Sequence, residues 1–328
     1  MAIIDFHDHY YPPAYIDALR NGQSTVKVDL DAEGNPRLHY PGDYNVAVRG
    51  HRDIDFREQE LAKYGVDVQV ISLTTPGTHV ETPANAAKLA SLVNDAFADV
   101  AARKKGKFVA LATLPLNDPA ASVKEFERAT RQFGFRGAML FSNVNEVALA
   151  DERFWPLYEV ADESNAILHI HPTAPVGVEA MQDYWLMPLV GFLFDTTLAA
   201  EKLVFSGVAE RFPRIRWVLS HLGGAIPYIA ERADRGFYAF KECRAKISRP
   251  PSEYLKQFYY DTVNFDPLAL KLAVDFAGAE HVLAGSDYPH QIGSIPEMLK
   301  SLRSLHIPEA DRAKILGGNA AHLLNLAA

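Results

Sequence analysis

Two histidines stand two positions apart near the start of the chain, in the stretch DFHDH at residues 5 to 9. The surrounding run is typical of a β-strand, in which residues two apart point to the same side. His7 and His9 are therefore expected to face the same space, where two imidazoles can bind one metal ion. The pair alone does not decide between a metal site and an ordinary solvated strand, because such spacings also occur by chance.

Three more ionisable residues stand at the ends of later apolar runs. His171 ends ILHIH, His221 ends RWVLSH, and Asp287 follows VLAGS. If these runs are parallel strands of one barrel, their side chains meet His7 and His9 at one mouth. Imidazole nitrogens with one carboxylate oxygen suit zinc or another divalent transition metal, with a position left for an acidified water.

The other histidines are weaker candidates for catalysis or metal binding. His169 is expected one layer below His171, either in core packing or supporting a ligand. A solvated or internally satisfied role is expected for His39, His51, His79, His281, His290, His306 and His322. Of these, His290 follows Asp287 closely enough to line the same pocket.

The elements that would position these residues follow a repeating pattern. Short apolar runs alternate with segments of helical periodicity such as residues 118–134, which is the pattern of repeated βα units. The predicted strands are Ile3–His9, Val68–Leu73, Phe108–Leu111, Gly137–Phe141, Ile167–His171, Ile215–His221, Phe258–Thr262 and Val282–Asp287. Eight such strands are the number that a closed barrel needs, so the sequence predicts an α/β fold, a TIM-like (β/α)8 barrel.

Residues 21–52 interrupt this alternation after the first strand. The stretch TVKVDLDAEGNPRLHY alternates like a hairpin around a turn rich in Asp, Gly, Asn and Pro. Loops that follow strands form the catalytic face of such a barrel, so the inserted hairpin is expected to be a lid or rim over the site. The sequence contains no linker or repeat, and residues 1–328 are expected to form one domain.

Composition restricts the class of partner. The 328 residues are 48% hydrophobic and 23% charged, with a formal net charge of −8 and no run of Lys and Arg. This excludes the basic surface of a nucleic-acid or anionic-membrane binder and favours a small-molecule partner. Cys243 is the only cysteine and the opening residues lack the pattern of a secretory signal, which together predict a cytoplasmic protein. The most apolar stretch, residues 184–205, contains Pro and charged residues and is expected to be a buried or subunit-packing helix.

Several motifs in order resemble the amidohydrolase superfamily, and within it the metal-dependent decarboxylase branch typified by 2-amino-3-carboxymuconate 6-semialdehyde decarboxylase. They are DFHDHYYPP, HIHPT, SHLGGAIPYIAERADR, VLAGSDYPH and GGNAAHLLNL, and the resemblance spans nearly the whole chain. It implies one divalent metal ion, usually Zn²⁺ with Mn²⁺ as the alternative, held by His7, His9, His171, Asp287 and a water. It also implies that His221 is a general acid/base beside that water and not a ligand.

The same resemblance implies how a substrate carboxylate is held. Arg232 would reach a carboxylate in the neighbouring subunit of a homodimer, with a surface salt bridge as the alternative. An arginine of the insertion also binds carboxylate in this family, and Arg49 and Arg52 are the candidates here. Trp185, in the similar stretch DYWLMPLVG, is a further substrate-binding candidate.

Departures from the family pattern affect the pocket. Thr173 stands where the family has an aromatic residue, and the motif at His221 has two glycines where the family has three. The substrate therefore need not be the muconate semialdehyde. The run GAMLFSN ends without the lysine that binuclear members carry there, which favours a single metal.

The leading hypothesis is metal-dependent, non-oxidative decarboxylation of a small unsaturated or aromatic carboxylic acid. Arginines would dock the carboxylate, His221 would handle the proton at the reacting carbon, and Asp287 would hold the metal and hydrogen-bond the water. Hydrolysis of a lactone, amide or ester by the same site is the alternative. A third hypothesis, ligand binding without turnover, predicts loss of a metal ligand, whereas all four are present.

Overall fold

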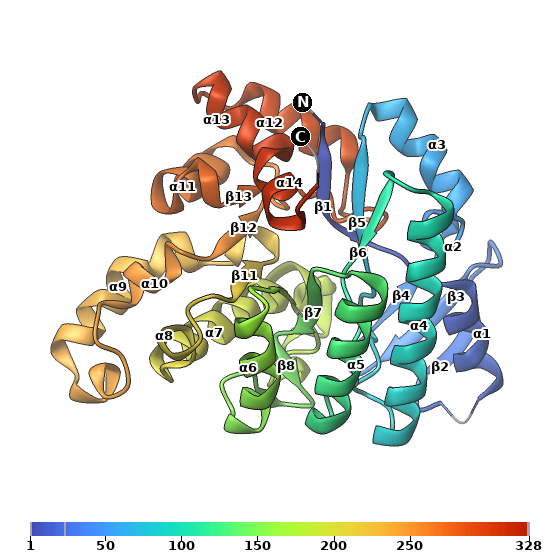
Figure 1. Ribbon diagram of the computed structural model, residues 1–328, viewed down its shortest axis with the longest axis horizontal. Coiled ribbons are helices and arrows are strands. Elements are labelled where there is room, and N and C mark those ends of the chain that lie inside the picture. The colour runs from blue at the N-terminus through green and yellow to red at the C-terminus, as the bar shows by residue number, and fades with distance from the viewer. Residues whose placement is uncertain (1, 23, 327–328) are drawn as a thin grey trace.

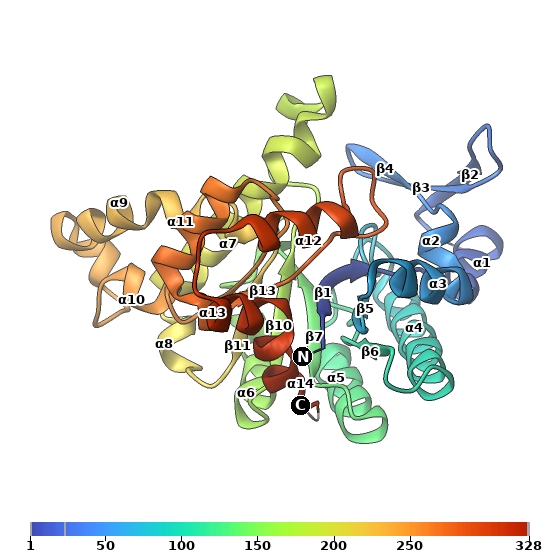
Figure 2. The same cartoon turned by 90° about the horizontal axis from the view of Figure 1, so that it is seen from above.

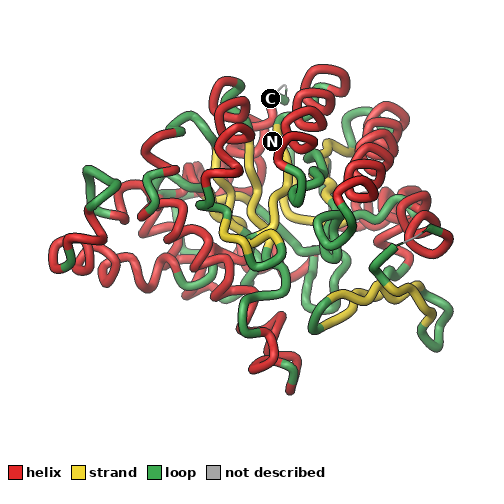
Figure 3. The backbone as a smooth tube through the Cα atoms, turned by 90° about the horizontal axis from the view of Figure 1, so that it is seen from below, coloured by secondary structure: helices red, strands yellow, loops and turns green. Residues whose placement is uncertain are grey.

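The computed structural model describes residues 2–22 and 24–326. Parallel strands form the centre of the molecule, and helices surround them (Figures 1 and 3). One set of three strands consists of β1 (Ile4–His9), β5 (Val68–Ser72) and β6 (Phe108–Ala110). A second set of five consists of β7 (Gly137–Phe141), β10 (Ile167–His171), β11 (Arg216–Leu219), β12 (Tyr259–Asp261) and β13 (Val282–Leu283).

Short bridges join the two sets into a ring. Ala112 pairs with Ala138 in β7, and Asp8 pairs with Tyr288 beyond β13, both in parallel orientation. Next to the second bridge, the backbone N–H of Asp287 donates to the carbonyl of His7 at 2.8 Å. The ring of eight strands confirms the predicted TIM-like barrel.

Two strands that carry predicted site residues are shorter than expected. β11 ends at Leu219, before His221, and β13 ends at Leu283, before Asp287. His221 and Asp287 have φ values of 54° and 57°, in the left-handed region where a strand cannot continue. Each side chain therefore stands on a turn just beyond its strand.

The helices lie on the outside of the barrel (Figure 2). The longer ones are α1 (Pro13–Asn21), α3 (Ile54–Tyr64), α4 (Pro83–Arg103), α5 (Pro119–Phe133), α6 (Trp155–Glu163), α7 (Phe192–Phe205), α9 (Ile226–Ala239), α11 (Pro267–Ala277) and α12 (Ile295–Ser304). Shorter ones are α2 (Arg49–Arg52), α8 (Val208–Arg211), α10 (Pro251–Leu255), α13 (Glu309–Ala313) and α14 (Asn319–Leu324). The side chain of Asp118 accepts the backbone N–H of Ala121 at the start of α5, and Gly134 ends this helix at a φ of 73°, as its sequence predicts.

The predicted hairpin is present in the insertion. β2 (Lys27–Leu30) pairs antiparallel with β3 (Pro36–Tyr40), and a third strand, β4 (Asp43–Val46), pairs with β3. This small sheet and the segment leading into α7 project on the same side of the barrel, away from the termini (Figure 2). The sheet therefore stands at the end of the barrel where the strands terminate.

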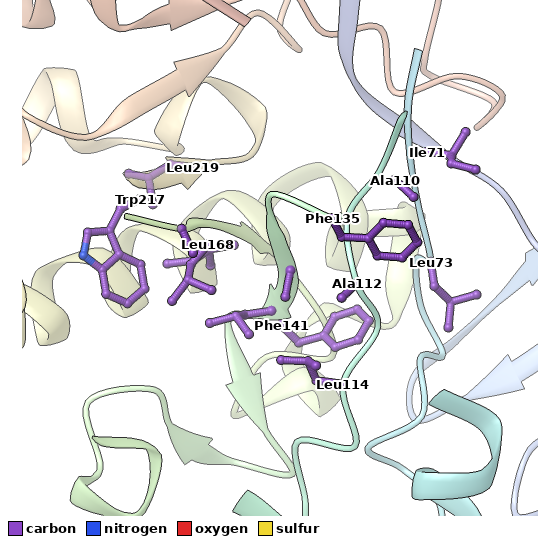
Figure 4. Close-up of a cluster of buried hydrophobic side chains, with 14 of the residues drawn as sticks. Ile71, Leu73, Ala110, Ala112, Leu114, Phe135, Phe141, Leu168, Trp217 and Leu219 are labelled. Carbon is purple, nitrogen blue, oxygen red and sulfur yellow. The ribbon is translucent and has the colours of Figure 1, made fainter. Parts of the chain in front are cut away.

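Buried apolar side chains fill the space between the strands and the helices. Leu168, Trp217 and Leu219 lie together on β10 and β11, while Ile71 and Ala110 belong to β5 and β6 (Figure 4). Full burial of one large apolar side chain contributes about 1.5–3 kcal/mol. This packing fixes the strand ends on which the site is built.

Residues 184–205 do not form the single helix that was expected. Tyr184 and Trp185 have positive φ values of 56° and 57°, which interrupt the helical conformation. A π-helical turn, Met187–Gly191, follows and leads into α7. α7 buries Leu203 but leaves Phe194 60% and Leu198 47% exposed, so the stretch is not fully buried. Within the described ranges, no helix combines the length and apolarity needed to cross a membrane.

Candidate metal centre

Four side chains with metal-ligating atoms converge at the mouth of the barrel. His7 and His9 come from β1, His171 from the end of β10, and Asp287 from the turn after β13. One ligand atom of each lies within 4.8 Å of the others, and all four residues are buried. The structure therefore brings together the four residues that the sequence analysis named as ligands.

The spacing within this cluster suits a single cation. Nε2 of His9 lies 3.1 Å from Nε2 of His7 and 3.1 Å from Oδ1 of Asp287. Ligands bound to zinc at about 2.0–2.2 Å in a tetrahedral arrangement stand roughly 3.3–3.6 Å apart. The observed separations are close to those that a shared ion would need, and the donor set of three imidazoles and one carboxylate fits a borderline divalent metal.

Asp261, at the end of β12, fixes the orientation of His7. Its Oδ2 lies 2.5 Å from Nδ1 of His7, so the proton of that imidazole is held on Nδ1 and Nε2 is left to face the cluster. Burial by itself would lower the pKa of His7, but the charge and hydrogen bond of Asp261 outweigh it and raise the pKa to about 9. Sequence reasoning missed Asp261, although it is an acidic residue at the end of a predicted strand, FYYDT.

Asp261 also holds the backbone around His221. Its Oδ2 accepts the N–H of His221 at 3.1 Å, and its Oδ1 accepts the N–H groups of Leu222 at 3.1 Å and Val263 at 2.9 Å. One buried carboxylate therefore connects a ligand-type histidine to the turn that carries His221. His7, His169 and Asp261 form a second close group. Nδ1 of His7 and Oδ2 of Asp261 are already joined there by a hydrogen bond, so these two atoms are not available to a metal ion.

Three of the four side chains favour the protonation states that bind a metal, whereas the raised pKa of His7 means that its imidazole would release a proton when an ion binds. Burial lowers the pKa of His9 and of His171 well below the ordinary value, which keeps their imidazoles neutral. Burial opposes ionisation of Asp287, but the nearby imidazole of His221 and the hydrogen bond with His9 hold its pKa well below the usual range. Neutral imidazoles and an ionised carboxylate are the forms that bind a metal.

His221 lies beside the cluster and outside it. It belongs to a short 3₁₀ turn, His221–Gly223, and its Nε2 is 3.9 Å from Oδ2 of Asp287. Its Nδ1 is buried and has no hydrogen-bond partner in the protein. The side chain lines a cavity of about 310 Å³ that also contains His171 and Asp287. This position suits a group that exchanges a proton with a bound molecule.

The insertion and the segment before α7 form the walls of this cavity. Tyr44 from β4 and Trp185 both line it, and their rings meet edge to face with centroids 5.7 Å apart. The inserted sheet is therefore a rim of the cavity. That it moves as a lid stays a prediction.

The predicted arginines lie elsewhere in the described chain. Arg49 is 63% exposed on its side chain and pairs with Asp53 at 2.8 Å, while Arg52 donates to the carbonyl of Ala47 at 3.0 Å. Neither of them lines the cavity. Arg232 is exposed on α9, where its reach toward another subunit stays a prediction.

His51 is the residue of α2 that faces the cavity, and the expectation of a solvated or satisfied role is wrong for it. Its side chain is buried and lines the cavity, yet neither ring nitrogen has a partner in the protein. His290, expected as a possible lining residue, lines the cavity beside it. His79 is buried too, but away from this cavity, against Phe141. On the short helix α2, His51 lines the cavity and its arginine neighbours do not. The sequence alone does not show which side of this helix faces the cavity.

Comparison with known proteins shows similarity over nearly the whole chain. The family model described as Amidohydrolase matches residues 4–326. The 2-amino-3-carboxymuconate-6-semialdehyde decarboxylase of Dictyostelium discoideum is 34% identical over 84% of this chain and 77% of that protein. The 6-methylsalicylic acid decarboxylase of Penicillium expansum is 29% identical over 98% of this chain and 96% of that protein. The crystal structure of 5-carboxyvanillate decarboxylase from Sphingomonas paucimobilis superposes with a TM-score of 0.88 at 28% identity, covering 99% of both chains.

Proposed function

The chain belongs to the amidohydrolase family, and from that premise we propose that it catalyses the metal-dependent, non-oxidative decarboxylation of a small aromatic or unsaturated carboxylic acid. The observation that carries the proposal is the convergence of three imidazoles and one carboxylate in a buried cluster. The similar proteins named above are decarboxylases of aromatic or muconate acids, which supports this reaction over others of the family.

The cluster of His7, His9, His171 and Asp287 would hold one divalent ion. When bound, such an ion supplies Lewis-acid chemistry and a fixed point for a substrate oxygen. His7 is oriented for this role by Asp261, and Asp287 is kept ionised by its histidine neighbours. All four side chains are buried, which strengthens their electrostatic interaction with a bound ion.

His221 would handle the proton of the reaction. In decarboxylation the reacting carbon gains a proton as its bond to the carboxylate breaks and carbon dioxide leaves. His221 lines the cavity with an unpartnered Nδ1 and an Nε2 that faces Asp287, so it can deliver this proton to a bound substrate.

Carbon dioxide release tests the proposal. The metal-loaded protein is assayed against hydroxybenzoates and carboxymuconates, with lactones as hydrolase substrates. We expect carbon dioxide from at least one acid, and we expect His221→Asn to keep its metal while kcat falls by about 10²–10⁴. Hydrolysis is less supported, because the named relatives are decarboxylases. Turnover of lactones with no carbon dioxide from any acid would replace our proposal with that alternative.

We further propose the finer features of the assignment. The three imidazole nitrogens favour Zn²⁺, with Mn²⁺ as the alternative. Exposed Phe194 and Leu198 on α7 and Tyr228 on α9 support a homodimer, in which Arg232 would reach the neighbouring site. The single cysteine supports a cytoplasmic location, and the continuous barrel supports one domain.

A further inference from the structure

His51 and His290 form an imidazole pair in the catalytic cavity that the reaction above does not use. Their ring centroids are 5.0 Å apart at an interplanar angle of 60°. His290 in turn lies against His9, with centroids 4.9 Å apart. His51 is 1% exposed, and both of its ring nitrogens lack a hydrogen-bond partner in the protein. Buried polar groups are normally hydrogen-bonded, and the protein provides no such bond for the ring nitrogens of His51.

The other side-chain donors of the cavity are neutral groups, among them those of Tyr44, Trp185 and Gln291. Among its described lining residues there is no Lys or Arg. The amide nitrogen of Asn45 is already bonded to Tyr11 and to both oxygens of Thr75. Besides His51, the buried lining atoms that lack partners are Oγ1 of Thr74 and Nδ1 of His221. His221 has the proton transfer to perform, so His51 is the buried, unpartnered imidazole of the cavity that the proposed reaction does not use.

The backbone holds His51 in place. The carbonyl of His51 accepts the N–H of Tyr11 at 2.7 Å, and the carbonyl of Gly50 accepts Nε of Arg57 at 3.1 Å. A Cβ at Gly50 would stand 2.5 Å from Oη of Tyr288 and 2.9 Å from Cβ of Pro289, so α2 packs closely on the turn after β13. The imidazole is therefore positioned before any ligand arrives, which lowers the entropy cost of binding.

The charges of the cavity restrict what His51 can bind. A divalent ion carries two positive charges, Asp287 neutralises one, and a single substrate carboxylate neutralises the other. Asp43 adds a further carboxylate to the lining. A second carboxylate on the substrate would need a cation from outside these lining residues, such as the Arg232 that we propose the neighbouring subunit contributes. An uncharged oxygen, such as a ring hydroxyl, needs no such cation.

We propose that His51, backed by His290, is a substrate-binding residue that hydrogen-bonds an uncharged oxygen substituent of an aromatic monocarboxylic acid. An imidazole has an N–H donor in either tautomer, so the bond does not depend on which nitrogen carries the proton. His51 thereby selects hydroxylated acids over the unsubstituted acid. This inference rests on the proposed function, because it takes the carboxylate to be bound at the metal centre.

Equilibrium binding to the metal-loaded protein tests the proposal, by calorimetry with benzoate and the three monohydroxybenzoates. The variants are His51→Leu, which removes the donor, and His51→Gln, which keeps one. His79→Leu is the matched control, because His79 is also buried with an unpartnered Nδ1 but does not line the cavity. Metal content is measured for each variant.

The wild-type protein should bind one hydroxybenzoate more tightly than benzoate. His51→Leu should weaken the binding of that hydroxybenzoate about tenfold or more and the binding of benzoate less than twofold. His51→Gln should restore part of the loss, and His79→Leu should change neither affinity. Equal weakening of both acids, no weakening, or loss of metal in His51→Leu would each overturn the proposal. The binding assay needs no turnover. A failure to release carbon dioxide would therefore reject the proposed function, whereas the binding test of His51 would still give a decisive result.

Discussion

At the scale of single residues, Asp261 connects the metal centre to the acid/base group. Its two oxygens face one imidazole nitrogen, on His7, and accept three backbone N–H groups, two of which belong to His221 and Leu222. Groups that orient a metal ligand through its second nitrogen influence affinity without touching the ion. Asp261 is therefore a positioning residue for both His7 and His221.

Asp261→Asn should weaken metal binding while the fold persists. The amide retains the shape of the carboxylate but removes its charge, so His7 loses the partner that fixes its tautomer. We expect about 10- to 100-fold lower metal affinity, measured by competition with a chelator of known affinity. Asp151→Asn, an exposed carboxylate outside the cavity, is the control. Unchanged affinity in Asp261→Asn would show that His7 does not need this partner.

Individual residues also show where sequence reasoning succeeds and where it stops. His171 and Asp287 could be named because each follows an apolar run, and parallel strands end at the same mouth. His51 could not, because its burial depends on how α2 packs against Tyr288 and Pro289, which are far away in the chain. Contacts between distant segments leave no periodic pattern in the sequence.

At the scale of elements, a buried ion pair joins α3 to β1. Nη1 of Arg57 lies 2.5 Å from Oδ1 of Asp8, and both side chains are fully buried. Arg57 also donates to the carbonyl of His9, and Asp8 lies between His7 and His9 in the strand. The pair therefore supports the strand end that presents both histidines.

Arg57→Leu should destabilise the protein strongly. Removing the guanidinium leaves a buried carboxylate without its counter-charge, which typically costs about 3–5 kcal/mol. A lower urea midpoint measures the loss. Arg235→Leu is the control, since Arg235 pairs with Glu231 on the surface and should contribute little. Equal midpoints for the two variants would contradict a structural role for the buried pair.

The elements themselves were largely predictable, with errors at their ends. Buried strands are continuous apolar runs, so all eight could be located, and the hairpin followed from its alternation and its turn. The ends of β11 and β13 could not be predicted, because His221 and Asp287 adopt positive φ values. Such values place their side chains in the site but are incompatible with a continuing strand. The break at Tyr184 and Trp185 was missed for the same reason.

At the scale of the whole molecule, the proposed dimer makes a direct prediction about shared sites. If Arg232 acts in the neighbouring site, mixing His221→Asn with Arg232→Ala should restore activity. In a mixed dimer, the site of the second variant keeps its own His221 and receives an intact Arg232 from its partner. Carbon dioxide release is measured after subunit exchange and compared with each variant alone. No recovery, with exchange demonstrated, would place Arg232 outside the catalytic site.

The central claim is that His7, His9, His171 and Asp287 together hold one divalent ion at the mouth of the barrel. Its most direct test is the metal content of the purified protein, measured by plasma mass spectrometry for the wild type, His9→Ala and His322→Ala. His322 lies on α14, outside the cluster, and serves as the control. We expect about one ion per chain in the wild type and in His322→Ala, and a large loss in His9→Ala. The same metal content in all three proteins would contradict the claim.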